Sequence, residues 1–62
     1  MDKNLVSANF NMTFDNGSFI KNEPYQFKTD IGKNLVYVTT EEGKKQEFSF
    51  PEFDTLFTLL KI

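Results

Sequence analysis

A strict alternation of apolar and polar residues from Val6 to Asp15 constrains the fold of this chain more than any other feature. Successive side chains of a β-strand point to opposite faces of a sheet, so a period of two indicates a strand with one buried face. The apolar members of this series are Val6, Ala8, Phe10, Met12 and Phe14. We therefore predict a strand over residues 5–15 that covers a hydrophobic core.

The pair Asn16–Gly17 follows this strand directly. Asn and Gly tolerate the positive φ angles that a tight hairpin turn requires. We predict a two-residue turn at Asn16–Gly17 and a returning strand over residues 18–21. Alternating apolar residues predict further strands over residues 24–29 and 45–49, and β-branched and aromatic residues predict another over residues 35–41.

The segment from Leu35 to Thr40 is rich in β-branched and aromatic residues on both of its faces. Strands that are covered on both sides have this composition. We expect a central strand here, and after it a tight charged turn over residues 41–44, which are Glu41, Glu42, Gly43 and Lys44.

The C-terminal segment carries the start signal of a helix. Ser49 and Glu52 have the spacing of a capping box, in which each side chain bonds the backbone amide of the other residue, and Pro51 suits the first helical turn. The apolar residues that follow recur at helical spacing and are Phe53, Leu56, Phe57 and Leu60. We predict an amphipathic helix over residues 50–61.

Together these elements predict an α+β fold. The strands would form an antiparallel meander of four to five strands, as a small barrel or an open sheet, with one C-terminal amphipathic helix. A chain of 62 residues is near the lower size limit for a stable core, so we expect residues 1–62 to form a single domain.

The composition argues against chemistry of the chain's own. It contains no His, the commonest general base, and no Cys, the source of a thiol nucleophile. Both residues are also the usual ligands of transition metals. The remaining acids show no regular calcium-binding spacing. We expect no enzymatic activity, no cofactor and no metal.

The charge pattern bears on partners and location. The net charge is −2 and Arg is absent, which disfavours binding to nucleic acid. No stretch has the apolar character of a secretion signal or a membrane span, so we expect a cytoplasmic protein with no membrane partner.

Candidate interaction residues lie at two places. Leu59 and Ile62 point away from the helical stripe, and would form a surface for self-association as a homodimer or for another protein. Glu41 and Glu42 present their charges in the turn after the central strand.

The order of turns and strands predicted from residue 16 to 57 resembles that of small Src-homology-type β-barrels. A polar turn precedes an aromatic strand, then come a central apolar strand, a charged turn, and a closing strand with a short helical turn. The residues that carry the resemblance are Phe19–Tyr25, Val36–Val38, Glu41–Gly43 and Phe48–Phe53. Such barrels are common among small accessory proteins of Gram-positive phages and prophages, which implies the cytoplasm of a host cell. Four strands followed by one helix also resemble the coactivator family that binds single-stranded DNA.

Two functions follow as hypotheses. The first is a non-catalytic protein-binding module, such as a small phage-type modulator or inhibitor of a host protein. The alternative is a weak single-stranded nucleic-acid-binding domain, in which Tyr25 and Tyr37 would stack on unpaired bases.

Overall fold

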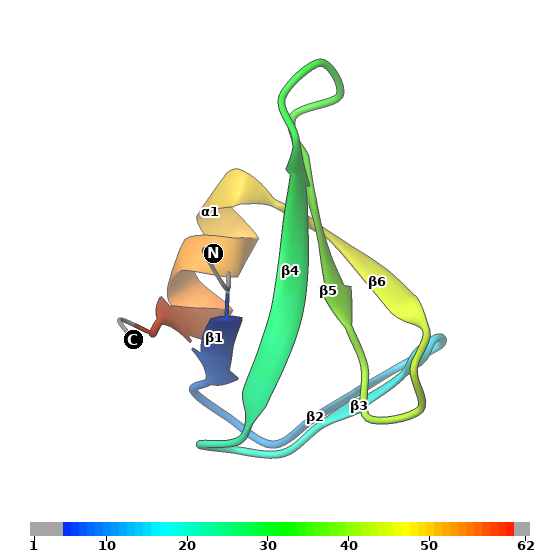
Figure 1. The fold of residues 1–62 in the computed structure, drawn as a ribbon, viewed down its shortest axis with the longest axis vertical. Coiled ribbons are helices and arrows are strands. Elements are labelled where there is room, and N and C mark those ends of the chain that lie inside the picture. The colour runs from blue at the N-terminus through cyan, green and yellow to red at the C-terminus, as the bar shows by residue number, and fades with distance from the viewer. Residues whose placement is uncertain (1–4, 61–62) are drawn as a thin grey trace.

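The computed structural model describes residues 5–60. Figure 1 shows a strongly bent sheet with one short helix at its side and a hairpin across its lower end. Along the chain the elements are β1 (Leu5–Ala8), β2 (Met12–Phe14), β3 (Gly17–Phe19), β4 (Pro24–Asp30), β5 (Leu35–Thr39), β6 (Lys45–Ser49), α1 (Phe50–Leu56) and β7 (Phe57–Leu59).

Five strands form one sheet in the order β6-β5-β4-β1-β7, and β2 and β3 form a separate two-stranded sheet. Every strand pairing is antiparallel. The larger sheet is open, because β6 and β7 are its two edges and are not joined to each other. This confirms the α+β class with an antiparallel sheet and a C-terminal helix, in its open-sheet form. The sheet is not closed into a barrel.

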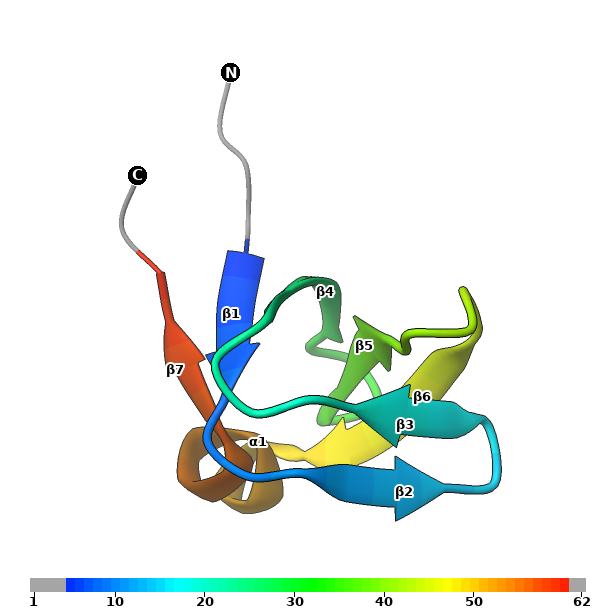
Figure 2. The same ribbon diagram turned by 90° about the horizontal axis from the view of Figure 1, so that it is seen from below.

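Only β4, β5 and β6 follow one another as a meander. The remaining neighbours in the sheet are distant in sequence, since β1 lies between β4 and β7. Val6 is opposite both Tyr25 and Leu59, and the amide of Leu60 donates to the carbonyl of Leu5 at 2.9 Å. The two ends of the described chain therefore lie side by side (Figure 2).

The hydrophobic core lies inside the bend of the sheet, under the hairpin. Its buried residues come from every strand except β2 and are Val6, Ala8, Phe19, Tyr25, Val36, Val38, Phe48 and Phe57. Phe19 is only 1% exposed. Its ring centroid lies 4.9 Å from that of Tyr25, 5.2 Å from Phe57 and 6.0 Å from Phe48. Edge contacts of this kind favour aromatic packing beyond the area that they bury.

The first predicted strand is divided in two. Residues 5–15 alternate as predicted, but β1 ends at Ala8 and β2 begins at Met12. The amide of Asn9 donates to Leu56 O at 2.8 Å and its side chain donates to Thr55 O at 3.1 Å. Asn9 therefore donates hydrogen bonds to the last turn of α1 instead of continuing β1. At this residue the chain leaves the large sheet and enters the hairpin.

The hairpin forms, but its turn lies one residue earlier than predicted. Asp15 and Asn16 are the turn residues, and Gly17 is the first residue of β3, opposite Phe14. Asn16 does not have positive φ, whereas Gly17 has a φ of +133°. The prediction of a hairpin is therefore correct, but the predicted position of its turn, at Asn16–Gly17, is wrong by one residue.

The helix is shorter than predicted. Residues 50–61 were expected to be helical, but α1 ends at Leu56 and β7 begins at Phe57. Phe57 pairs with Ala8 in β1 and is 4% exposed. Pairing with β1 buries Phe57 in the core, and this tertiary contact overrides the helical spacing of the apolar residues.

The start of the helix is as predicted. Ser49 is the N-cap, Pro51 lies in the first turn, and both halves of the capping box are present. The amide of Ser49 donates to Glu52 Oε1 at 3.0 Å, and the amide of Glu52 donates to Ser49 Oγ at 3.3 Å. The Ser49 amide lowers the pKa of the Glu52 carboxyl, because this hydrogen bond favours the charged form.

We expect Ser49→Ala to lower the free energy of unfolding by about 1 kcal/mol, the usual effect of losing an N-cap hydroxyl. Urea titration measures this change through the midpoint. Thr55→Ala is a matched control, since its hydroxyl donates to Pro51 O on the exposed side of the same helix. A midpoint for Ser49→Ala equal to that of the wild type would contradict the capping role.

Gly17→Ala tests how closely the hairpin approaches the turn after β5. A Cβ atom at Gly17 would lie 2.7 Å from Thr40 Cβ, and the φ of +133° is unfavourable for any L side chain. We expect a loss of at least about 2 kcal/mol of unfolding free energy.

Gly43→Ala is the control for this variant. Gly43 also has positive φ, at +84°, but nothing lies within 4 Å of the place that a Cβ atom would take there. We expect this variant to lose only about 1 kcal/mol, from backbone strain alone. Equal losses for the two variants in urea titration would show that the close approach at Gly17 contributes nothing.

Candidate functional site

The outer face of β4, β5 and β6 carries the residues that alternate along each strand with the buried core residues. The register places Lys28 and Glu47 on either side of Tyr37, and Lys45 next to Thr39. Tyr37 is half-buried although no second layer from the described residues covers this face (Figure 1). The apolar character of both faces of β5 predicted a strand covered on each side, and the structure covers only the inner one.

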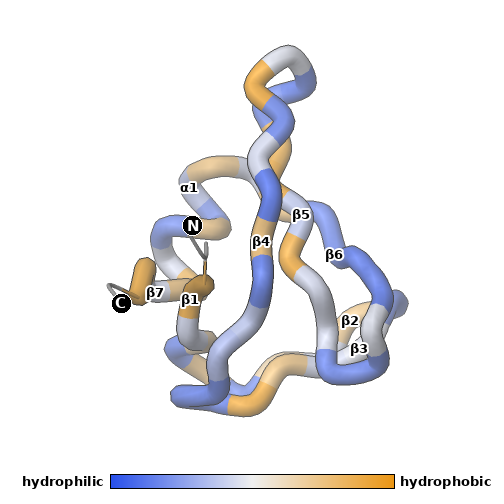
Figure 3. The backbone as a smooth tube through the Cα atoms, viewed as in Figure 1, coloured by the Kyte–Doolittle hydropathy of each residue, from blue (hydrophilic) through white to orange (hydrophobic). Residues whose placement is uncertain are grey.

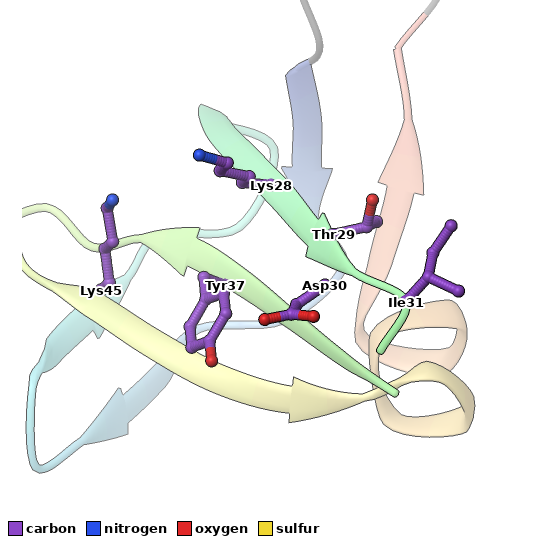
Figure 4. A pocket seen from close by; sticks show the side chains of 6 residues that line it. All are labelled: Lys28, Thr29, Asp30, Ile31, Tyr37 and Lys45. Atoms are coloured by element: carbon purple, nitrogen blue, oxygen red, sulfur yellow. The ribbon is translucent and has the colours of Figure 1, made fainter. Parts of the chain in front are cut away.

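A hollow of about 530 Å³ lies on this face (Figure 4). The residues that line it come from β4, the β4–β5 loop, β5 and β6, and are Lys28, Thr29, Asp30, Ile31, Tyr37 and Lys45. Figure 4 shows the Tyr37 ring in view between Lys45 and Asp30. Ile31 is 79% exposed. Figure 3 shows one hydrophobic segment in the loop between β4 and β5, which is otherwise hydrophilic or intermediate in hydropathy.

Two smaller hollows continue from the first. One of about 240 Å³ shares Lys28, Tyr37 and Lys45 with it, and a third of about 230 Å³ shares Gln26 and Thr39 with the second. We call the three together the outer groove. It follows β4 and β5 for most of their length, roughly 20 Å at 3.3–3.4 Å per residue.

The charges along the outer groove differ in how they are engaged. The Asp30 carboxylate accepts from the amide of Lys33 at 3.2 Å. The ammonium groups of Lys28 and Lys45, by contrast, take part in no side-chain hydrogen bond among residues 5–60. Glu47 lines none of the three hollows. The free charges of the outer groove are therefore positive.

Of the two acids predicted as interaction residues, Glu41 lines one end of this groove and Glu42 holds the hairpin. The Glu42 carboxylate accepts from the amide of Ser18 at 2.8 Å and from its hydroxyl at 3.1 Å. Glu41 Oε2 accepts from the hydroxyl of Tyr25 at 2.7 Å. Both carboxylates are thus bound within the protein, although both residues are exposed.

Two further hydrogen bonds join the same elements. Thr40 Oγ1 donates to Asn16 O at 3.0 Å, and the side chain of Asn16 donates to Lys45 O at 2.9 Å. We call these contacts, with those of Glu41 and Glu42, the turn clamp. The structure therefore brings Asn16, predicted for its turn, together with Glu41 and Glu42.

The Ser18 contacts of the turn clamp favour the ionised form of the Glu42 carboxyl. The backbone amide of Ser18 holds the pKa of Glu42 below its usual value. A lowered pKa in the folded state adds stability above the ordinary pKa of a glutamate. This contribution is lost as the pH falls through the lowered value.

Leu59 lies apart from the outer groove. It is 59% exposed, as expected, but it belongs to the edge strand β7 and not to the helix. Ile62, predicted beside it, lies outside the described residues. The structure therefore shows one exposed apolar residue at this edge.

Sequence reasoning named Tyr37 only as a candidate for base stacking, and it missed the groove around it. The signal was present, because Leu35–Thr39 has apolar residues on both faces, and within the described residues 5–60 no other segment forms a second layer over the outer face. Lys28 and Lys45 could not be assigned to one site before the register of three strands was known.

Comparisons of the chain with models of protein families, with characterised proteins and with solved structures gave no match. Within residues 5–60, no helix has the length and apolar character to cross a membrane. Over the same residues, no three acidic side chains gather in a way that could hold a metal ion.

The hydroxyl of Tyr25 provides a spectroscopic test of the turn clamp. Burial raises the pKa of Tyr25 to about 12, although the hydrogen bond from the Ile20 amide opposes the shift. The chain contains two tyrosines. We expect ultraviolet titration to show one phenol that ionises near pH 12 and disappears in Tyr25→Phe.

The same shift predicts how stability changes with pH. Because the pKa is raised in the folded state, its contribution is complete below the unfolded value of about 10 and is lost as the pH rises toward 12. Tyr25→Phe also removes two hydrogen bonds, and we expect it to lower the unfolding free energy by about 2 kcal/mol. Tyr37→Phe is the control, and a high-pH phenol that persists in Tyr25→Phe would contradict the assignment.

Proposed function

We propose that this chain is a non-catalytic protein-binding module and that the outer groove is its working surface. The observation that carries this proposal is Tyr37, a half-buried aromatic residue on a sheet face that no other element of residues 5–60 covers. Aromatic side chains in partly enclosed pockets are typical anchors of protein interfaces. The absence of His and Cys supports a role without chemistry.

The shape of the outer groove supports a protein partner over a compact small molecule. Its three hollows follow one another along two strands and are open to solvent. A length of roughly 20 Å matches about six residues of an extended peptide. An extended segment of another protein would therefore contact the groove along its whole length.

Single-stranded nucleic acid is the alternative ligand. Tyr37 between Lys28 and Lys45 favours it, because stacking on an aromatic ring and pairing of phosphates with cations are what such binders use. Tyr25, the other tyrosine considered, is 5% exposed and bonded through its hydroxyl, so it contributes nothing to stacking. The net charge of −2 and the absence of Arg make this the weaker hypothesis.

The order of the elements supports the resemblance to Src-homology-type barrels. A hairpin separates the first two strands of the large sheet, and a helical turn comes before the last strand. On this ground we propose a modulator or inhibitor of the phage accessory type, which would act on a host protein in the host cytoplasm. Self-association through Leu59 would be a further protein contact of the same module.

Selection from a display library of random peptides tests the proposed function. We expect the domain to enrich peptides that shift the NMR signals of β4 and β5, and Tyr37→Thr to abolish their binding because it removes the aromatic surface. Thr is also favoured in strands, so the fold should persist. Phe10→Thr is the matched control, since Phe10 is 52% exposed but lines none of the three hollows.

The same NMR titration with an oligothymidylate tests the alternative. Binding of the oligonucleotide at the outer groove, with no peptide enriched there, would replace protein binding by nucleic-acid binding. Peptides that bind Tyr37→Thr as well as the wild type would place the working surface elsewhere.

A further inference from the structure

We infer that the outer groove binds an acidic peptide segment in extended form, with an apolar side chain on Tyr37 and carboxylates at Lys28 and Lys45. This inference rests on the proposed function and adds the chemistry of the partner. It follows from three observations about the groove, which concern its free charges, its apolar surface and its acids.

The free charges are the first observation. Lys28 projects from β4 directly opposite Tyr37, and Lys45 projects from β6 diagonally from Tyr37, so the two cations come from the strands on either side of β5 (Figure 4). Neither ammonium group takes part in a side-chain hydrogen bond among residues 5–60. Both are available to a ligand. Glu47, opposite Tyr37 on β6, lines none of the three hollows, so charge complementarity within the groove favours an acidic ligand.

The apolar surface is the second observation. The ring of Tyr37 and the side chain of Ile31 line the same hollow, and Ile31 is 79% exposed. An exposed isoleucine beside an aromatic ring gains contact only when an apolar group covers both. The ligand should therefore place one apolar side chain here, with its acidic residues on either side.

The acids of the groove are the third observation, and they favour a peptide over a nucleic acid. Asp30 lies in the largest hollow and Glu41 at the far end of the groove. Each is hydrogen-bonded within the protein. A polynucleotide carries a charge at every phosphate and would meet both acids, whereas a peptide can present neutral residues at these two points.

The spacing of the cations sets the spacing of the ligand's acids. Lys28 is directly opposite Tyr37, and Lys45 is opposite Thr39, two residues farther along β5. Direct neighbours across strands are about 5 Å apart and diagonal neighbours about 7–8 Å. Carboxylates two residues before and two residues after the apolar anchor lie on the same face of the extended peptide as the anchor, so their side chains can reach the ammonium groups.

The experiment uses synthetic peptides of defined charge and the full chain. The probe is a short peptide, blocked at both ends, with one phenylalanine between two pairs of glutamates. A second peptide has glutamine in place of each glutamate, and a third has lysine. Binding is measured by fluorescence anisotropy of a label on the peptide at low and at high salt, and the site is mapped by NMR.

We expect the glutamate peptide to bind about tenfold more tightly than the glutamine peptide at low salt, and the lysine peptide not to bind. The advantage of the glutamate peptide should shrink at high salt, since exposed ion pairs are screened. Lys28→Gln and Lys45→Gln should each weaken the glutamate peptide about threefold and leave the glutamine peptide unchanged.

Lys21→Gln is the matched control, because it removes the same charge at a residue that lines none of the three hollows. It should leave the affinity for the glutamate peptide within the experimental error. An effect of Lys21→Gln equal to that of Lys28→Gln would mean that net charge alone attracts the peptide, and this would overturn the inference.

The outcomes separate this inference from the proposed function. Equal binding of the glutamate and glutamine peptides at the outer groove would overturn the acidic partner and leave the protein-binding surface intact. Binding of neither peptide there, with selected library peptides found on another face, would overturn both. Tighter binding of an oligothymidylate than of the glutamate peptide, with loss in Lys28→Gln, would also overturn the acidic peptide.

Discussion

The packing of Phe19 is the interaction on which the rest of this structure depends. An open, strongly bent sheet leaves its inner face exposed at one end, and a chain of 62 residues has few elements to cover it. The β2–β3 hairpin does so by inserting Phe19 among the rings of Tyr25, Phe48 and Phe57, which come from three different strands. Without Phe19 the hairpin would lose its main hydrophobic contact with the sheet, and the core would be exposed to water.

The turn clamp fixes the hairpin in the position that this packing favours. Glu41 and Glu42 hold Tyr25 and Ser18, and the Gly17 backbone passes close to Thr40. The carboxylates of these two exposed acids are therefore hydrogen-bonded within the protein. The sequence suggests that the turn offers negative charge to a partner, whereas the structure leaves Lys28 and Lys45 as the uncommitted charges of the outer groove. A net negative chain thereby presents a locally positive groove.

The sequence predictions are correct where a structure depends on residues close in sequence and wrong where it depends on residues far apart. The capping box at Ser49 and Glu52 and the strand over residues 45–49 were correct, since they depend on neighbours within a few residues. The helix end was wrong because Phe57 is taken into β7 by pairing with Ala8, far away in sequence. The break after Ala8 has the same origin, since Asn9 bonds to the end of α1.

The candidate site shows the same division. Tyr37 could be recognised as unusual from the apolar character of both faces of its strand, but the groove around it could not. Lys28, Tyr37 and Lys45 lie on three strands, and their meeting depends on a register that two separate turns determine together.

The pairing of β1 with β7 has a mechanical consequence. Leu5 and Leu60 are bonded neighbours at the same end of two antiparallel strands. Tension applied between these two residues would pull the strands apart from that end and break their hydrogen bonds one after another, instead of loading all of them at once. The domain should resist such a pull only weakly, and β7 would peel away first. The Asn9 contacts to α1 would be the next to yield, while the outer groove on β4, β5 and β6 lies beyond the line of force.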